Sequence, residues 1–393
     1  MPSPPLHVVQ ISFFFDAARR LPEELLEAWP TLGDVAEAAV MAGVRVSVVQ
    51  ACAHCAHLER NGVHYYFRPF GHSAGSSNET LQMLLEALAP DALHVHGLGF
   101  LRDTLALRAI CPEIPIILQD HANRPPRIWR RPSWRRALSV AAGICFCARG
   151  QAHPFLASGL IQPSTPVYEV PESTCRFSPG DRRQARRMEQ IAGDPAVLWV
   201  GHLDDNKDPL TVLSGISEAV DALPGVQLYC CYGTGPLLEP VQERIASDSR
   251  LRGRVHLLGR VAHERIEHLM RAADLFVLGS HREGSGYSVI EALACGLAPV
   301  VTDIPSFRSL TAGGTVGALW PVGDASGLAR ALRSAAARVG EETRAAVRTH
   351  FERELSFEAV GKKLAAMYGD VVERAVSSGT QRPAARKAAS GTL

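Results

Sequence analysis

Two glutamates, Glu283 and Glu291, bracket a Gly/Ser-rich turn and the helical pattern that follows it. The apolar run "LFVL" before the turn is typical of a buried parallel strand, and "YSVIEALA" after it has helical spacing and good helix formers. A strand–turn–helix unit presents unpaired backbone N–H groups and the positive end of a helix dipole at its turn. These features suit a phosphate group beside two carboxylates, so we expect the unit to hold an activated, phosphate-bearing donor.

Size and charge limit the classes of protein to consider. A chain of 393 residues predicts two domains. Lys+Arg 41 against Asp+Glu 40 gives no global field, which argues against non-specific nucleic-acid binding. No apolar run approaches the roughly 20 residues that cross a bilayer, and "MPSPPLHVVQ" lacks the basic and apolar regions of a signal peptide. We therefore expect a cytoplasmic protein.

Strand-like and helix-like segments alternate through both halves of the chain, which predicts α/β architecture with parallel sheets. The alternation lapses into Pro, Ser, Gly and charge between residues 170 and 185 and then restarts. We expect two Rossmann-like domains facing each other across a cleft. The expected ranges are an acceptor-side domain over 1–175, a donor-binding domain over 176–350, a helix crossing back to the first domain over 351–375, and a disordered tail over 376–393.

Ligands of such sheets bind beyond the carboxyl ends of the strands. Two polar motifs of the first half follow strand-like runs: "HVHGLG", with His94, His96 and Gly97, and "QDHA", with His121. Both are candidates for contact with a substrate.

Several sequence blocks in a fixed order resemble the retaining nucleotide-sugar glycosyltransferases of family 4, which have the GT-B fold. The blocks are "LWVGHLDDNKDPLTVLSGI", "CCYGTGPLLEPV" and the stretch from "VHLLG" to "ACGLAPVV", which carries a Glu-x7-Glu motif. The resemblance is strong over about residues 195–310 and weak in the first half. It implies transfer of a sugar from a nucleotide-diphosphate sugar, with retention of configuration and without a metal or other cofactor.

The resemblance also implies roles for single residues. Glu283 matches the glutamate that contacts the donor sugar, Glu291 the one that binds the ribose, and His121 a histidine close to the transferred sugar. Lys207 matches the phosphate-binding lysine. Backbone N–H groups and an ammonium can stabilise a departing diphosphate without a metal. The remaining donor-site candidates are the residues of the turn, and the residue after the Gly of the first block: Gly284, Gly286, Tyr287, Ser288 and His202.

The sequence departs from the family at two places. His202 stands where the family commonly has an arginine, so less charge faces the diphosphate. The first loop offers only Gly33 instead of a Gly-Gly pair. That loop belongs to the acceptor side, so the acceptor is not inherited: a saccharide, a lipid-linked molecule and a small molecule stay open. His96 and Gly97 are acceptor-side candidates, and His94 and His96 have structural roles as the alternative.

Other interpretations stay open. A nucleotide-sugar epimerase and a degenerate binding protein fit the same architecture. "GTGPLL" lacks the third glycine of a dinucleotide fingerprint. Cys52 and Cys55 form one C-x2-C pair without a second, so a plain loop is favoured over zinc. The Arg/Trp-rich segment 124–136 suits peripheral contact with the inner membrane face or an anionic acceptor, and a solvated loop and helix is its alternative.

Overall fold

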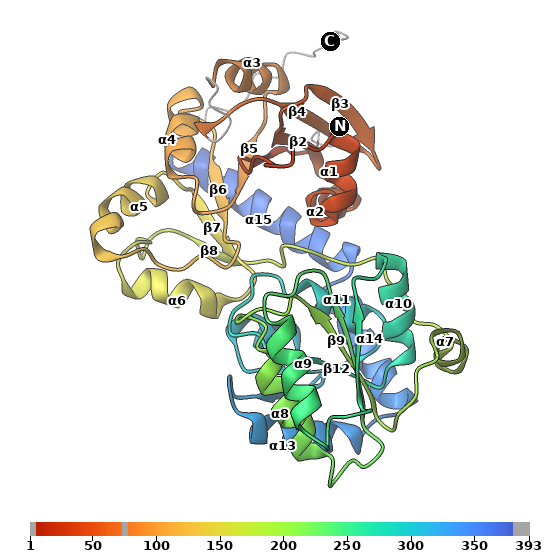
Figure 1. The fold of residues 1–393 in the computed structure, drawn as a ribbon. Helices are drawn as coiled ribbons and strands as arrows, with labels where there is room; N and C mark the ends of the chain where they lie inside the picture. The colour runs from red at the N-terminus through yellow and green to blue at the C-terminus, as the bar shows by residue number, and fades with distance from the viewer. Residues whose placement is uncertain (1–4, 73–77, 380–393) are drawn as a thin grey trace. The chain divides into compact units, whose positions relative to one another are not determined.

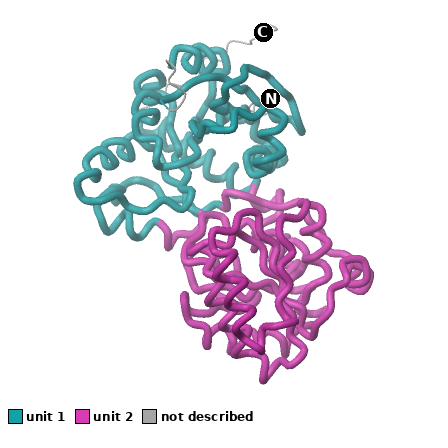
Figure 2. The backbone as a smooth tube through the Cα atoms, in the orientation of Figure 1, with its two compact units in different colours: residues 1–146, 152–170, 361–393 teal, residues 147–151, 171–360 magenta. Residues whose placement is uncertain are grey.

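The chain forms two compact units, each built around one sheet (Figure 2). A computed structural model describes residues 5–72 and 78–379. Unit 1 contains the described residues of 1–146, 152–170 and 361–393, and unit 2 contains 147–151 and 171–360. The domain ranges expected from the sequence stay a prediction, and most of the tail expected to be disordered lies outside the described residues.

Unit 1 is built on an eight-stranded sheet with the order β3-β4-β2-β1-β5-β6-β7-β8. All neighbouring strands pair in parallel except β3 with β4, which form an antiparallel edge. The strands are β1 His7–Ser12, β2 Arg45–Ala51, β3 Ala56–Arg60, β4 Val63–Arg68, β5 Ala92–His96, β6 Ile116–Gln119, β7 Gly143–Phe146 and β8 Val167–Glu169.

Cys52 and Cys55 lie in a loop after β2, as expected, and the edge strand β3, which the sequence did not predict, begins directly after them at Ala56. Its pairing with β4 places His57 against the ring of Tyr66, with ring centroids 4.4 Å apart. Strand β3 alternates Ala56 and Leu58 with exposed polar residues, but both apolar side chains are only partly buried, so pairing with β4 defines this short strand. Across residues 5–72 and 78–379, no group of three or more His, Cys, Asp and Glu side chains could hold a metal ion.

Helices surround the sheet of unit 1 (Figure 1). They are α1 Pro22–Ala28, α2 Pro30–Met41, α3 Glu79–Leu88, α4 Leu101–Ile110, the short 3-10 helix η2 Ile128–Arg130, α5 Arg131–Leu138, and the larger parts of α6 Arg149–Ala157 and α15 Phe357–Ser377, whose first residues belong to unit 2. The last of these, α15, packs on a sheet whose final strand in the sequence, β8, ends at Glu169. Tyr368 of α15 is fully buried, and its hydroxyl accepts a hydrogen bond of 3.1 Å from Gln10 of β1.

Unit 2 has a six-stranded parallel sheet with the order β11-β10-β9-β12-β13-β14. Its strands are β9 Ala196–Gly201, β10 Gln227–Tyr232, β11 Val255–Gly259, β12 Leu275–Leu278, β13 Ala298–Thr302 and β14 Ala318–Trp320. The direction of chain progression reverses between β9 and β12, which is where doubly wound sheets bind ligands. The expectation of α/β architecture with parallel sheets is confirmed.

The helices of unit 2 are α7 Arg182–Glu189, α8 Pro209–Ala219, α9 Leu238–Ser247, α10 His263–Ala272, α11 Tyr287–Ala294, α12 Pro305–Leu310, α13 Ala325–Ala336 and α14 Glu341–Glu354. Two of the sequence expectations are met closely: "LFVL" is the fully buried strand β12, and "YSVIEALA" is α11. None of the described helices combines the length and the apolar character that crossing a membrane requires.

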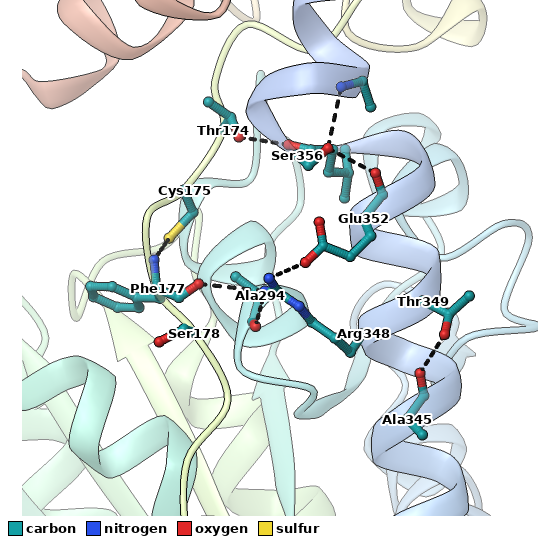
Figure 3. Close-up of polar contacts among 12 residues, drawn as sticks. Thr174, Cys175, Phe177, Ser178, Ala294, Ala345, Arg348, Thr349, Glu352 and Ser356 are labelled. Atoms are coloured by element: carbon teal, nitrogen blue, oxygen red, sulfur yellow. Dashed lines mark hydrogen bonds and ion pairs between the residues drawn. The ribbon is translucent and has the colours of Figure 1, made fainter. Parts of the chain in front are cut away.

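Helix α14 holds the carboxyl end of α11 and the segment that enters unit 2 (Figure 3). Arg348 of α14 donates from Nη1 to the carbonyl oxygen of Ala294 at 2.5 Å and to that of Phe177 at 3.5 Å. Thr174 donates to the carbonyl oxygen of Leu355 at 2.6 Å, just beyond α14. The last turn of α11 is thus fixed by a cation, while its first turn stays directed at the loops after β9 and β12.

Candidate active site

Lys207 and Glu283 form an ion pair at the reversal point of the sheet in unit 2. Lys207 lies in the loop after β9 and Glu283 in the loop after β12, and Nζ of the lysine contacts Oε1 of the glutamate. Their side chains are 17% and 13% exposed. The sequence singled out both residues but not their direct contact, because they stand 76 positions apart.

Main-chain and side-chain hydrogen bonds tie the two loops together. The N–H of His281 donates to the carbonyl oxygen of Asn206 at 2.8 Å, and the Asn206 amide donates to the carbonyl oxygen of Arg282 at 3.0 Å. Asp204 accepts from the N–H of Lys207 at 2.9 Å. The residues on either side of Glu283 and Lys207 are therefore held in register before any ligand arrives.

A third segment supports Glu283 from a distant part of the chain. The side-chain amide of Gln151 donates to the carbonyl oxygen of Glu283 at 2.9 Å, and its oxygen accepts from the N–H of Ala148 at 2.8 Å. Residues 147–151 belong to unit 2 although their neighbours on both sides belong to unit 1. No pattern around Gln151 in the sequence indicates this contact.

The turn between Glu283 and α11 depends on Gly286. This residue caps α11 with φ +64°, in the left-handed region, and a Cβ added to it would lie 2.8 Å from Cε1 of Phe307. Gly284 lies in the same turn, and the helix begins at Tyr287 and Ser288. First-turn N–H groups have no acceptor within their own helix, so this end of α11 favours an anion.

Glu291 differs from Glu283 in its surroundings. Only 3% of it is exposed, and Nε2 of His263 lies 2.5 Å from its Oε1. Burial raises the pKa of Glu291, and the hydrogen bond and charge of His263 act in the opposite direction. The His263 ring also packs against Phe177 and Tyr287, with ring centroids 4.7 Å and 6.3 Å apart. Sequence reasoning missed His263, which lies 28 residues before Glu291 at the start of α10.

His202 joins the loop after β9 to the Gly-rich turn after β10. Its Nδ1 accepts from the N–H of Thr234 at 3.2 Å and lies 2.9 Å from the Thr234 hydroxyl oxygen. The His202 side chain is exposed, so its other ring nitrogen reaches solvent or a ligand. The structure thus brings together the "GHL" and "GTG" blocks.

The candidates of unit 1 form a row of three imidazole rings. Ring centroids of His94 and His96 lie 4.6 Å apart, and those of His96 and His121 lie 5.6 Å apart. His94 is fully buried, with Nδ1 2.8 Å from the Tyr368 hydroxyl, and burial lowers its pKa to about 3. Burial also lowers the pKa of His96 well below the usual value, so both rings are neutral at pH 7.

Gly97 ends this row of candidates in the turn after β5. Its φ of +109° and the 2.8 Å that would separate an added Cβ from Phe100 explain the glycine by backbone geometry.

In chemical terms, unit 2 offers a lysine ammonium, two carboxylates of different exposure and the positive end of a helix around one turn. Such a set can bind a diphosphate and stabilise the charge that develops on it as a leaving group. The carboxylates add acceptors for hydroxyl groups.

Comparison with known proteins relates this region to glycosyltransferases, as the resemblance of the sequence blocks implied. The sequence model described as glycosyl transferases group 1 matches residues 194–338, which include Lys207, Glu283 and Glu291. A D-inositol 3-phosphate glycosyltransferase of Geodermatophilus obscurus is 30% identical over 56% of this chain and 48% of its own length. A phosphatidyl-myo-inositol mannosyltransferase of Mycolicibacterium smegmatis is 32% identical over 39% of this chain and 40% of its own. The chain thus spans about half or less of these relatives.

Solved structures match over nearly the whole chain. A glycosyltransferase from Rickettsia africae superposes with a TM-score of 0.71 at 13% identity, covering 94% of this chain and all of that one. The Anabaena protein HepE in complex with UDP gives a TM-score of 0.69 at 16% identity, covering 93% of this chain and all of that one. At these identities the similarity concerns the fold.

Proposed function

We propose that this chain, which belongs to the glycosyl transferases group 1 family and has the GT-B fold, is a retaining glycosyltransferase that uses a nucleotide-diphosphate sugar. The observation that carries the proposal is the Lys207–Glu283 pair beside the first turn of α11, within the matched residues. A cation, a carboxylate and a helix N-terminus at one sheet reversal are what a sugar bound through a diphosphate requires.

In the proposed reaction the bond between the anomeric carbon and the diphosphate oxygen breaks. An acceptor hydroxyl oxygen bonds to the same carbon on the same face, and its proton passes to the departing diphosphate. Lys207 and the first N–H groups of α11 stabilise the negative charge that grows on the diphosphate, so they bind the transition state more tightly than the ground state.

The two glutamates take different parts of the donor. We assign Glu283 to the sugar, because it precedes the phosphate-binding turn, and Glu291 to the ribose hydroxyls. His263 holds one oxygen of Glu291, which orients the carboxylate so that the other oxygen accepts from the ribose. His121, in unit 1, stays a prediction from the resemblance, and a fall in kcat of His121→Asn would support it.

Names of similar proteins indicate the class of donor. One relative, from Xanthomonas campestris, is a GDP-mannose:cellobiosyl-diphosphopolyprenol alpha-mannosyltransferase, and HepE is recorded with UDP. We therefore propose a UDP- or GDP-sugar. The acceptors in the names of the relatives range from D-inositol 3-phosphate to cellobiosyl-diphosphopolyprenol, so the acceptor is assigned only as a hydroxyl-bearing saccharide, lipid-linked molecule or small molecule.

The proposal is tested by a thermal-shift screen against UDP, GDP, ADP and their sugars. A ligand at 100 times its Kd should add about 2.7 kcal/mol to the free energy of unfolding. Lys207→Ala should lower kcat by about 100-fold, because one preorganised charge contact is lost. Arg252→Ala removes an equal charge from an exposed position in unit 2 and serves as the control.

Three results would contradict the proposal. If none of the ligands produced a thermal shift and Lys207→Ala kept the wild-type kcat, the donor site would be ruled out. A sugar nucleotide isomerised without an acceptor, and without release of nucleoside diphosphate, would identify an epimerase. Binding without turnover towards any acceptor would indicate a degenerate binding protein.

A further inference from the structure

One stretch of this chain carries only positive side-chain charges, although the composition of the whole chain is balanced. Residues 121–168 contain no Asp and no Glu, but they contain seven arginines. Six of these seven lie between residues 124 and 136, at the start of this stretch. An unbalanced run of this kind produces a local positive field although the whole chain carries a formal net charge of only +1.

This run folds against α4 and encloses a hollow within unit 1. Helix α5 packs beside α4, and η2 continues directly into α5 (Figure 1). The hollow between them has a volume of about 850 Å³, and its lining includes Arg102, Arg130, Arg136 and Ser133. Three guanidinium groups from two separate parts of the sequence thus line one concave surface.

The charge of the hollow is not neutralised from within. Asp103 is the acid in its lining, and this side chain is buried and accepts from the N–H of His72 at 2.6 Å. In the part of the chain that the structure describes, Arg102, Arg130 and Arg136 form no ion pair with a carboxylate. The Arg102 guanidinium lies 3.0 Å from a ring nitrogen, Nε2 of His72.

The first turn of α4 adds to the positive character of the hollow. Gly99, Phe100 and Leu101 line it, and the cap residue Phe100 supplies no side-chain acceptor to the helix N–H groups. Guanidinium groups with backbone donors match the oxygens of a phosphate group in number and direction.

An exposed apolar pair adjoins the hollow. Ile128 is 74% exposed and Trp129 is 70% exposed, and both precede Arg130 in η2. The guanidinium of Arg127 lies 5.3 Å from the centre of the Trp129 ring. Exposed tryptophan and isoleucine between arginines suit the boundary between lipid headgroups and acyl chains, where an aromatic ring and a cation are both satisfied.

We propose that this hollow binds the phosphate of an anionic lipid headgroup, with Ile128 and Trp129 inserted beside it. Arg102, Arg130 and Arg136 contact the phosphate oxygens, while the Ser133 hydroxyl donates to the carbonyl oxygen of Arg130 at 2.8 Å. The inference concerns unit 1 alone and stands whether or not the donor site of unit 2 is correctly assigned.

The test uses the full chain with vesicles of phosphatidylcholine alone and of equimolar phosphatidylcholine and phosphatidylglycerol. We expect co-sedimentation with the second vesicles only. Arg136→Gln should weaken this binding about 10-fold to 100-fold, because a charge-assisted contact is lost. Arg124→Gln removes the same charge from the same run but outside the hollow, and should weaken binding about fivefold or less.

Further variants separate the parts of the site. Trp129→Ala should weaken vesicle binding and leave the binding of inorganic phosphate, measured by calorimetry, unchanged. Arg102→Gln should weaken both. All four positions are exposed, so the thermal midpoint should stay near that of the wild type and the variants remain interpretable.

Three outcomes would overturn the proposal. Equal losses in Arg124→Gln and Arg136→Gln would indicate a diffuse charge effect instead of a pocket. Binding of inorganic phosphate without binding to anionic vesicles would assign the hollow to a soluble phosphate compound. If the chain bound neither inorganic phosphate nor anionic vesicles, the proposed site in the hollow would be ruled out. That result would leave the nucleotide screen described for unit 2 unaffected.

Discussion

The two glutamates of the Glu-x7-Glu motif hold different nitrogen partners. Glu283 contacts a lysine, whereas Glu291 contacts a histidine. Glu283 is partly accessible and Glu291 is almost completely buried. The same residue type thus serves at two levels of burial, with a lysine partner in one case and a histidine partner in the other.

Substitution of the two glutamates should separate binding from catalysis. Glu283→Gln removes the negative charge that Lys207 faces, so the lysine becomes more available to phosphate oxygens. We expect a loss in kcat of about 100-fold with no loss of affinity for the free nucleoside diphosphate. Glu291→Gln should instead raise donor KM and leave kcat nearly unchanged. Calorimetry with the nucleoside diphosphate and steady-state kinetics check both, and the same pattern in both variants would contradict the separate roles.

His263 should control how donor binding depends on pH. Burial raises the pKa of Glu291 and His263 opposes that rise, so His263→Ala lifts the pKa of the carboxylate further. The carboxylate then takes up its proton at a higher pH as the solution is acidified. We expect donor KM in His263→Ala to increase on acidification from a higher starting pH than in the wild type.

His263→Gln is the matched variant for this experiment, because its amide can still donate to Glu291. It should restore most of the affinity at neutral pH. A pH profile of KM that is identical in His263→Ala and the wild type would rule out the positioning role.

At the scale of elements, the site depends on close approaches between neighbouring segments. The loops after β9 and β12 approach at Gly279, where an added Cβ would lie 3.1 Å from the carbonyl oxygens of Lys207 and Asp208. The cap of α11 approaches α12 at Gly286. Both glycines therefore allow the close approaches that set the position of the neighbouring charged groups.

Gly286→Ala should destabilise unit 2 and disturb the turn before α11. The alanine would need a left-handed φ and would meet Phe307 at 2.8 Å, so we expect a loss of about 1–3 kcal/mol in the free energy of unfolding. Gly369→Ala is the control, because it lies within α15 with no heavy atom within 4 Å of the added Cβ. Chemical denaturation measures the stability of both variants. A midpoint of Gly286→Ala equal to that of the wild type would show that the turn tolerates a side chain.

At the scale of the whole molecule, the last helix is tied to the sheet of unit 1 by buried polar groups. The Tyr368 hydroxyl contacts Gln10 of β1 and His94 of β5, and His94 in turn contacts Oε1 of Gln119 in β6 at 3.1 Å. Gly361 allows the approach to α2, since an added Cβ would lie 2.1 Å from the carbonyl oxygen of Ala38. The packing of α15 is specified by this network as well as by apolar contact.

Acidification should weaken this network. Burial lowers the pKa of His94 to about 3, whereas an unfolded histidine titrates near 6.5, so the unfolded state binds more protons below that pH. The contribution of His94 to the free energy of unfolding is therefore fully present above about pH 6.5 and decreases as the pH falls toward 3. We expect a loss of about 2 kcal/mol between pH 7 and pH 5 from this residue.

Thermal unfolding at these two values of pH provides the measurement, with His94→Gln as the comparison. The variant should be less stable at pH 7 and should lose less on acidification. Burial lowers the pKa of His7 to about 4 and that of His96 well below its usual value, and both residues remain in the variant, so they account for loss that persists there. An equal loss in the variant and the wild type would exclude His94 as the cause.

The amino-acid sequence by itself determined the elements that local periodicity and glycine placement encode. The strand "LFVL", the helix "YSVIEALA" and the order of the phosphate-site blocks follow from spacing within a few residues. It did not predict β3, because this short edge strand is defined by its pairing with β4.

Only the tertiary structure decided which distant residues meet. The contacts of Lys207 with Glu283 and of His263 with Glu291, and the arginine-lined hollow beside α4, depend on strand order and on the direction of side chains. None of these three features is a local property of the sequence, because each brings together residues that the chain separates by tens of positions. The Gly/Ser turn was therefore evident from the sequence, while the partners that give its two carboxylates different chemistry came from the fold.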